Sequence, residues 1–374
     1  MPGVYVHLPF CPYLCPYCDF AKRIARAGEP ERYLSALRAE MLRLPSRSAA
    51  TIFIGGGTPN AYPMRDLAGL IVELRKHFRV PPDAEISVEL NPDPGLCAEL
   101  ELLRPAGVTR LSFGVQSMIE AELRVLGRQH RAEDVRTVVG FARNAGFSNL
   151  SADLIFGAPG QSVESWMYSL DEILALEFKH VSTYGLTIED GTPYAGWYAR
   201  EPARFADEGL QSELYAIAME RLPAAGYEQY EISNFARPGF RCRHNENYWA
   251  DGEYLGLGVG AAAHLDGERT IHTRDFETYV GAALRGESIP GERESLVGAP
   301  KLGEAIMLAL RTAAGVELRA FANRYQSDFR AQFRRELEEM RTLGLIEETE
   351  THVRLTRNGR MLANEVAAAF IVLP

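Results

Sequence analysis

A strand-like segment followed by a turn and a helix-like segment recurs six times in the first half of the chain. The strand-like segments are rich in β-branched or aromatic residues. This alternation predicts a parallel sheet covered by helices, either a barrel or an open doubly wound sheet, with functional residues at the carboxyl ends of the strands. The expected strands are residues 4–8, 51–54, 85–90, 110–115, 150–156 and 180–186. The expected helices are residues 30–44, 64–78, 95–104, 120–126, 132–145 and 163–176.

Three of the five cysteines lie directly after the first expected strand. Cys11, Cys15 and Cys18 have the spacing C-x-x-x-C-x-x-C, and three thiolates on one loop suit a soft metal centre. A structural zinc ion would need a fourth ligand, and an odd triplet fits a disulfide framework poorly. A cubane 4Fe-4S cluster on three cysteines leaves one iron open to a small molecule. Aromatic residues in this loop, including Tyr17, would exclude water from a cluster.

With this spacing the chain resembles the radical S-adenosylmethionine (radical SAM) enzymes. The resemblance implies that Cys11, Cys15 and Cys18 hold a 4Fe-4S cluster and that S-adenosylmethionine (SAM) binds the open iron. In that family the cluster and SAM supply the radical chemistry, and the protein orients them. The resemblance also selects the topology. We therefore predict an α/β fold, a partial (β/α)6 barrel followed by a mainly helical, winged-helix-like C-terminal domain.

Motifs with polar or glycine residues follow the expected strands. Gly55, Gly56 and Gly57 stand in a row before Thr58-Pro59, and consecutive glycines allow a ligand to approach the backbone closely. Glu89 lies on an otherwise apolar strand, where a buried carboxylate needs either a ligand or an ion pair within the barrel. By resemblance, the residues of the SAM pocket are Tyr5, Tyr17, Gly56, Gly57, Thr58, Glu89, Gln116, Arg128 and Asp153.

Two further motifs are similar to one branch of the superfamily, which contains oxygen-independent coproporphyrinogen III dehydrogenase. Gln116 belongs to G-V-Q-S and is followed by Arg128 in G-R-Q-H, and Asp153 opens D-L-I-F-G-A-P-G-Q. A guanidinium group such as that of Arg128 can bind a carboxylate through two charge-assisted hydrogen bonds. Thr187, after the sixth strand, is a weaker candidate for a contact with the adenosyl group.

The segment H-N-E-N-Y-W, residues 244–249, joins a metal-binding imidazole to aromatic rings suited to a flat apolar partner. Taken alone, it is more typical of a packed domain corner. It resembles a motif of HemW-type haem chaperones, which makes His244 the leading haem contact, with Cys242 and His264 as alternatives. No C-x-x-C-H sequence for covalent haem attachment occurs. The glycine-rich residues 256–263 are expected to close over the barrel mouth.

The C-terminal part is expected to be helical at residues 301–311, 317–325, 329–343 and 358–369, with a hairpin at 349–356. Helices followed by a hairpin resemble a winged-helix domain, but balanced charges favour a lid or interaction domain over a DNA reader. The expected domains are 1–200, the barrel; 201–298, a connecting region whose H-N-x-x-Y-W element closes the barrel; and 299–374, the winged-helix-like domain.

Composition restricts where the protein works. The net charge of −10 disfavours nucleic acid as a partner. No run of 18 apolar residues predicts a transmembrane segment, and the first strand begins too early for a signal peptide. Cys97 and Cys242 alone remain outside the cysteine loop, so no disulfide framework is expected. These features predict a cytoplasmic protein and leave peripheral membrane association open.

Two functions share this set of motifs. The dehydrogenase has a further cysteine two residues after the third, where this chain has Phe20, and a long extension before the loop, which this chain lacks. The H-N-x-x-Y-W element is typical of the chaperones. We therefore predict a haem chaperone that uses a 4Fe-4S cluster and SAM and transfers haem to acceptor haemoproteins, respiratory ones by resemblance. The alternative is oxygen-independent coproporphyrinogen III dehydrogenase, a radical SAM decarboxylase.

Overall fold

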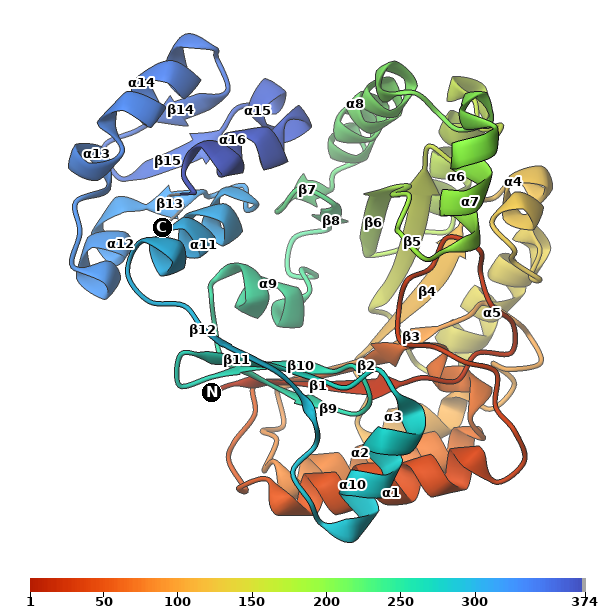
Figure 1. Cartoon of the computed structure of the whole chain (residues 1–374). Coiled ribbons are helices and arrows are strands. Elements are labelled where there is room, and N and C mark those ends of the chain that lie inside the picture. Colours follow the sequence, from red (N-terminus) through yellow and green to blue (C-terminus); the bar gives the residue numbers. More distant parts are fainter. Residues whose placement is uncertain (372–374) are drawn as a thin grey trace. The chain divides into compact units, whose positions relative to one another are not determined.

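The computed structural model describes residues 1–371, which form two compact units (Figure 1). The larger unit comprises Met1–Arg221 and Glu253–Glu294. The smaller unit comprises Leu222–Gly252 and the chain from Ser295 onward. Each unit is therefore built from two separate segments, and residues 201–298 contribute to both.

The larger unit is organised around a sheet with the strand order β12-β11-β10-β9-β1-β2-β3-β4-β5-β6. Strands β1 to β6 are parallel and adjacent in chain order, so the α/β partial barrel expected from the sequence is confirmed. Their bounds are Gly3–Leu8, Thr51–Gly56, Glu85–Leu90, Arg110–Gln116, Leu150–Phe156 and His180–Gly185. The main covering helices are α1 (Glu29–Arg43), α2 (Met64–His77), α5 (Ala132–Asn144), α6 (Val163–Ala175) and α10 (Phe276–Arg285).

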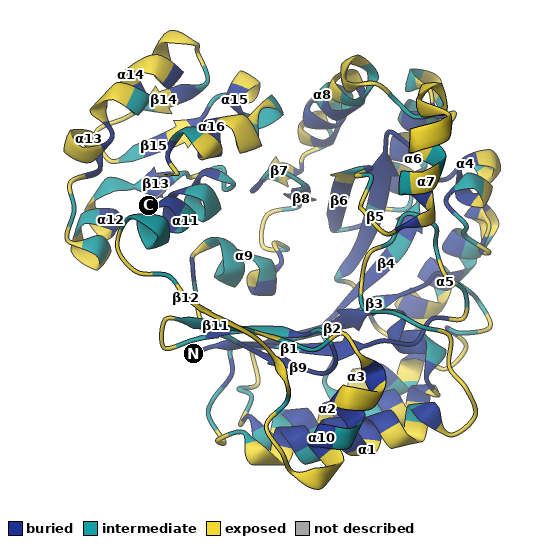
Figure 2. Cartoon of the chain, viewed as in Figure 1, coloured by how far each residue is buried: buried dark blue, intermediate teal, exposed yellow. Residues whose placement is uncertain are grey.

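Side chains of the parallel strands alternate between two environments. Val4, Val6 and Leu8 of β1 are fully buried against the helical layer, and Figure 2 shows the parallel strands largely in dark blue. The residues between them point to the inner face, where polar side chains gather on the later strands. On that face Asp153 of β5 accepts hydrogen bonds from Ser112 of β4 and from Ser182 of β6. The strands are thus apolar toward the helices and polar toward the barrel interior.

A seventh parallel strand was not expected from the sequence. Strand β9, Tyr254–Leu257, pairs with the free side of β1, and β10 (Ala262–Leu265), β11 (Glu268–His272) and β12 (Gly291–Ser295) continue the sheet. The first part of the glycine-rich segment therefore belongs to the sheet and is not a loop over the mouth. Gly256 is required there, because a Cβ atom would lie 2.0 Å from the carbonyl oxygen of Ala262.

The helix expected at residues 95–104 is mostly absent. The Asp93 side chain accepts hydrogen bonds from the amides of Gly95 and Leu96, and this turn replaces the first helical turn. Only a 3-10 turn, Leu100–Leu102, and the short α3, Leu103–Ala106, remain. The other connecting elements are a 3-10 turn at Pro59–Ala61, α4 (Glu120–Val125), α7 (Pro193–Arg200), a 3-10 turn at Pro202–Arg204 and α8 (Glu208–Ala224).

The smaller unit is mainly helical with a three-stranded antiparallel sheet in the order β13-β15-β14, which confirms the winged-helix-like prediction. Phe321, Phe329, Phe333 and Phe370 meet in its apolar core. Its helices are α9 (Arg243–Trp249), α11 (Ala299–Leu310), α12 (Leu318–Tyr325), α13 (Phe329–Gln332), α14 (Arg334–Thr342), α15 (Arg357–Met361) and α16 (Ala363–Ala369). Its strands are β7 (Glu228–Gln229), β8 (Asn234–Ala236), β13 (Val316–Glu317), β14 (Ile346–Glu348) and β15 (His352–Leu355).

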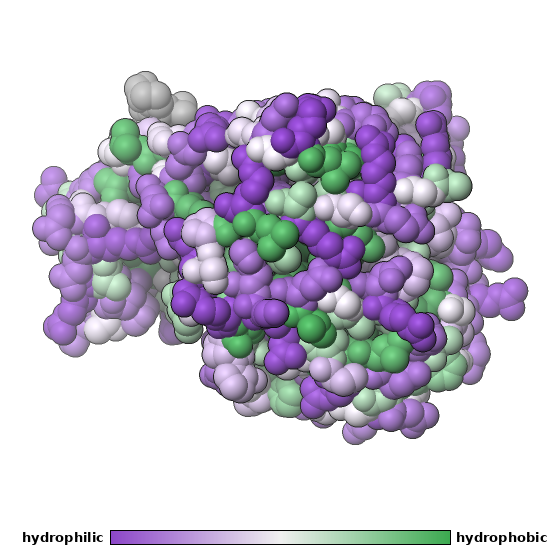
Figure 3. All heavy atoms as spheres, turned by 90° about the horizontal axis from the view of Figure 1, so that it is seen from below, coloured by the Kyte–Doolittle hydropathy of each residue, from purple (hydrophilic) through white to green (hydrophobic). Residues whose placement is uncertain are grey.

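The surface carries scattered apolar side chains. Figure 3 shows one face on which hydrophobic residues form small separate patches among hydrophilic ones, as is ordinary for folded proteins. Within residues 1–371, no helix combines the length and the apolar character needed to cross a bilayer.

Candidate functional site

A pocket of about 440 Å³ opens on the inner side of the barrel in the larger unit. The carboxyl ends of the strands and the cysteine loop form its walls. All three cysteines of the loop line it. Of the residues predicted to bind SAM, it is lined by Tyr17, Gly56, Gly57, Thr58, Glu89, Gln116, Arg128 and Asp153. The weaker candidate, Thr187, also lines the pocket.

The cysteine loop is tied to the barrel by main-chain hydrogen bonds. Cys11 N donates to the carbonyl of Arg23, and Arg23 N donates to the carbonyl of Pro9, each at 2.9 Å. Thr58 N donates to the carbonyl of Phe10, which joins the loop to the glycine-rich segment after β2. The pocket wall is therefore preformed by backbone contacts. Burial raises the pKa of the Cys11 thiol to about 11.

The donor set fits an iron–sulfur cluster. In the described part of the chain, no three Cys, His, Asp or Glu side chains are gathered closely enough to bind a single metal ion. Cys11, Cys15 and Cys18 nevertheless share one pocket. In a cubane each thiolate binds a different iron, and three thiols that line one pocket fit such a cluster.

Arg128 stands between the cysteine loop and the strand ends. Its Nη2 donates to Asn91 Oδ1 at 2.6 Å and to the Gly114 carbonyl at 2.9 Å. Its Nη1 lies 3.6 Å from Cys15 Sγ. Its Nε is buried without a hydrogen-bond partner among residues 1–371. A buried guanidinium with a donor to spare, next to the cysteine loop, suits an anionic ligand group such as a carboxylate.

Two carboxyl groups lie at the base of the pocket. Glu89 Oε2 accepts a hydrogen bond from Gly56 N at 3.3 Å. Burial, with a smaller contribution from the charge of Asp153, raises the pKa of Glu89 to about 7. Burial likewise raises the pKa of Asp153. Carboxyl groups held in this way would favour a ligand that brings a positive charge.

Two backbone features shape the pocket near these acids. A Cβ atom on Gly55 would lie 2.4 Å from Glu89 Oε2, so a side chain there would displace the carboxyl group. Gln116, at the end of β4, has a φ of 66°, a conformation that costs free energy for a residue other than glycine. Strain of this kind is frequent in ligand-binding sites and supports the assignment of Gln116 to one.

Replacement of Glu89 by glutamine is expected to stabilise the ligand-free protein at neutral pH. The folded-state pKa of about 7 exceeds the ordinary value of 4.5. Between these values the unfolded chain releases a proton that the folded chain keeps, so wild-type stability falls as pH rises through that window. The difference in melting temperature between the Glu89→Gln variant and wild type should be near zero at the acidic end of this pH window. It should be largest above the window, where it corresponds to about 1–3 kcal/mol. Glu339→Gln, at an exposed position of α14, is the control; a gain independent of pH would contradict the assignment.

Tyr5 is not among the residues that line the pocket. Its hydroxyl lies 3.0 Å from His7 Nδ1, and His7 Nε2 lies 2.6 Å from the carbonyl oxygen of Ala21. Burial lowers the pKa of His7 to about 4, so the ring is neutral; Nε2 donates to Ala21, and Nδ1 accepts from Tyr5. Tyr5 is thus connected to the end of the cysteine loop through His7.

The predicted haem contact, His244, lies in the smaller unit on α9. Its side chain is only 1% exposed, and its Nε2 lies 2.8 Å from the Tyr248 hydroxyl. The alternatives, Cys242 and His264, are also buried. In this conformation none of the three presents a ligand atom on an open surface.

Sequence reasoning missed Asn91 and Lys22, which both line the pocket. Asn91 accepts from Arg128 and holds Asn60 through its carbonyl oxygen. A signal was available for Asn91, because it directly follows β3, where functional residues of parallel sheets gather. No comparable signal marks Lys22 in the sequence.

Comparisons with known proteins agree with this geometry. Residues 5–173 match the model of the radical SAM superfamily, and residues 301–362 match the HemN C-terminal domain. The chain is 35% identical to the haem chaperone HemW of Bacillus subtilis, with 99% of each chain covered. It is 31% identical to HemW of Escherichia coli, over 99% of this chain and 98% of that protein.

Among solved structures, coproporphyrinogen III oxidase (HemN) from Escherichia coli, a radical SAM enzyme, has a similar fold. The TM-score is 0.86, over 99% of this chain and 90% of that chain. The sequence identity is 24%, so this similarity supports the fold and not the activity.

Proposed function

The chain belongs to the radical SAM superfamily and, within it, to the family of the HemW haem chaperones, and from this we propose that it binds haem and transfers it to acceptor haemoproteins. The observation that carries the proposal is its similarity to HemW along the entire chain. Phe20, which lines the barrel pocket, supports the same choice, because the dehydrogenase branch has a cysteine at that position.

We further propose that Cys11, Cys15 and Cys18 hold a 4Fe-4S cluster. Three thiols in one pocket, close to the guanidinium of Arg128, support this assignment. When bound, such a cluster supplies electron transfer to a sulfonium ligand. The aromatic rings of Tyr13 and Tyr17 in the same wall would limit the access of water to it.

The remaining pocket residues are proposed to bind SAM. Glu89 would accept hydrogen bonds from its ammonium group, and the donor of Arg128 that has no partner in the described chain would face its carboxylate. Gly56, Gly57 and Thr58 line the pocket and would contact the ligand through the backbone. Gln116 and Asp153 would complete the pocket; Tyr5 would act indirectly, by positioning the cysteine loop through His7.

We expect the transfer to occur in the cytoplasm, to haemoproteins of the respiratory chain. A chaperone is expected to leave the carboxyl groups of the porphyrin intact, whereas the dehydrogenase removes them as it decarboxylates its substrate. This is the point at which the proposal differs from a coproporphyrinogen III dehydrogenase.

One experiment tests the proposal. The protein is reconstituted anaerobically with iron and sulfide and then offered haem and coproporphyrinogen III in parallel. Haem is followed by its Soret absorption, and decarboxylation by mass spectrometry of the porphyrin. We expect stoichiometric haem binding and an unchanged number of carboxyl groups. Formation of the divinyl product, or the absence of haem binding, would overturn the chaperone assignment.

A further inference from the structure

The smaller unit contains a second cavity, of about 630 Å³, which the motifs at the barrel strands do not explain. Its walls come from the end of α9, from α11 and α12, and from the turn that joins α11 to α12. A cavity of this size lies within the range of sites that bind small molecules. One part of the lining is aromatic, with Tyr230, Trp249, Phe321 and Tyr325, and much of the remainder consists of alanines and one glycine.

The ring of Trp249 is held in place from outside the cavity. The guanidinium carbon of Arg311, which does not line the cavity, lies 4.7 Å from the centroid of this ring. Arg311 Nη2 is 3.6 Å from Glu231 Oε2, and the side chain of Glu231 is fully buried. The buried carboxylate of Glu231 thus holds the guanidinium of Arg311, and the cation–π contact of Arg311 fixes the indole ring as a wall of the cavity. Rigid aromatic side chains of this kind bind flat ligands at low entropic cost.

Helix α9 presents different residues on its two sides. Glu246, Trp249 and Ala250 line the cavity, whereas His244 and Tyr248, one turn apart, do not. Because residues three and four apart share one side of a helix, these two sets point in different directions. The H-N-x-x-Y-W motif therefore contributes its tryptophan to the cavity, and its histidine is bonded to its tyrosine on another side.

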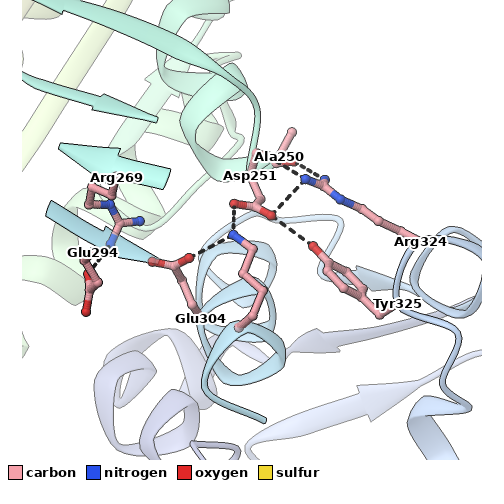
Figure 4. Close-up of polar contacts among 8 residues, drawn as sticks. Ala250, Asp251, Arg269, Glu294, Glu304, Arg324 and Tyr325 are labelled. Carbon is pink, nitrogen blue, oxygen red and sulfur yellow. Dashed lines mark hydrogen bonds and ion pairs between the residues drawn. The ribbon is translucent and has the colours of Figure 1, made fainter. Parts of the chain in front are cut away.

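The lining of the cavity carries two arginines together with three carboxylates, Glu246, Asp251 and Glu317. Arg241 and Arg324 both line it, and their side chains are 46% and 50% exposed. Arg241 pairs with Glu228 at 3.0 Å and with Glu246 at 3.5 Å. Both pairs are exposed and therefore weak, so an incoming carboxylate could replace them at little cost. Arg324 Nη2 donates to Asp251, which also binds Lys301 and Tyr325, as Figure 4 shows for the labelled residues.

Among residues 1–371, no histidine, cysteine or methionine lines this cavity. Tyr325 is a poor iron ligand in its present state, because burial and the neighbouring Asp251 raise the pKa of its hydroxyl. A ligand in this cavity would be held by ring contacts and by its own carboxylates, and not by a strong bond to a metal.

We propose that this cavity holds the haem, with the porphyrin against Trp249 and its propionates at Arg241 and Arg324. This inference rests on the proposed function and names the site for it. Binding without a strong axial ligand suits cargo that must be released to an acceptor. It also predicts that iron-free protoporphyrin IX binds about as tightly as haem.

The test uses a bulky side chain at the cavity wall. Ala320 lines the cavity on α12 and is exposed, so Ala320→Trp should narrow the cavity without disturbing the core. We expect it to weaken binding of both haem and protoporphyrin IX on the order of tenfold or more, measured by absorbance titration of the full-length protein. Asn323→Trp, on the same helix and exposed but outside the cavity, is the matched control and should bind as wild type does.

A second measurement does not depend on the variants. Hydrogen exchange of the wild type should slow in residues 243–250 and 312–325 when protoporphyrin IX is added. Equal haem binding by wild type and a folded Ala320→Trp protein, or no protection in those segments, would overturn the cavity assignment alone. Loss of haem binding in His244→Ala, with no binding of protoporphyrin IX by wild type, would place the haem on that histidine instead. Absence of haem binding by wild type would remove the proposed function itself.

Discussion

Replacement of Cys15 by alanine is expected to abolish formation of the iron–sulfur cluster. Anaerobically reconstituted wild-type protein should contain about four irons and four sulfides per chain, the stoichiometry of a cubane. Cys15 lines the pocket beside Arg128, and two thiolates cannot replace three at a site that already leaves one iron open. Iron and sulfide analysis, together with the electron paramagnetic resonance spectrum of the reduced protein, measures the effect.

The control for this variant is another cysteine. Cys97 is buried outside the loop, where Asn60 donates to its sulfur at 3.4 Å. Cys97→Ala removes a thiol without touching the proposed ligand set, so its iron content should match that of wild type. Zinc as the sole metal in reconstituted wild type, or full iron content in Cys15→Ala, would contradict the cluster assignment.

Replacement of Asp251 by asparagine is expected to destabilise the smaller unit by about 3 kcal/mol. Asp251 is buried and accepts from Lys301 Nζ at 2.7 Å, Arg324 Nη2 at 2.9 Å and the Tyr325 hydroxyl at 3.0 Å (Figure 4). Through these contacts it joins the end of α9 to α11 and α12. Asparagine tolerates the φ of 51° at this position, so the variant reports the loss of charge and not backbone strain.

The effect should be local to the smaller unit. Melting should begin roughly 10 °C or more below wild type for a unit of this size, and hydrogen exchange should accelerate in residues 243–251 and 299–310. The matched control is Glu338→Gln, which removes an exposed ion pair with Arg341 in the same unit and should change stability by less than about 0.5 kcal/mol. Equal effects of the two substitutions would show that Asp251 does not connect these helices.

The strands of the barrel could be predicted because each is a short apolar segment bounded by turns. All six agree with the structure to within two residues at each end. The helices that were predicted poorly have two different causes, one local and one tertiary. Asp93 forms a turn where a helix was expected, and the helix expected at 329–343 is interrupted at Phe333, whose ring lies in the aromatic core. A buried aromatic contact of this kind depends on residues distant in the sequence.

Strand β9 shows the same limit. Tyr254–Leu257 pairs with β1, with Tyr254 opposite Gly3, and the glycine-rich segment that begins within it resembles a loop. Its conformation is set by pairing with an available strand edge, which is information carried by the partner and not by the segment itself. The position of Asn91 directly after β3 was visible in the sequence, but its hydrogen bond with Arg128 joins two separate elements and is shown only by the structure.

The sequence by itself determined the chemistry available to the barrel. Three cysteines at fixed spacing and a ligand-type residue after each strand are local patterns, and parallel strands bring their carboxyl ends together whatever the details of packing. Only the tertiary structure decided in which direction the individual side chains point. It placed Tyr5 outside the pocket, buried His244 against Tyr248, and turned Trp249 into a cavity built with α11 and α12. The direction of a side chain depends on which neighbours bury it, and those neighbours are brought together only by the fold.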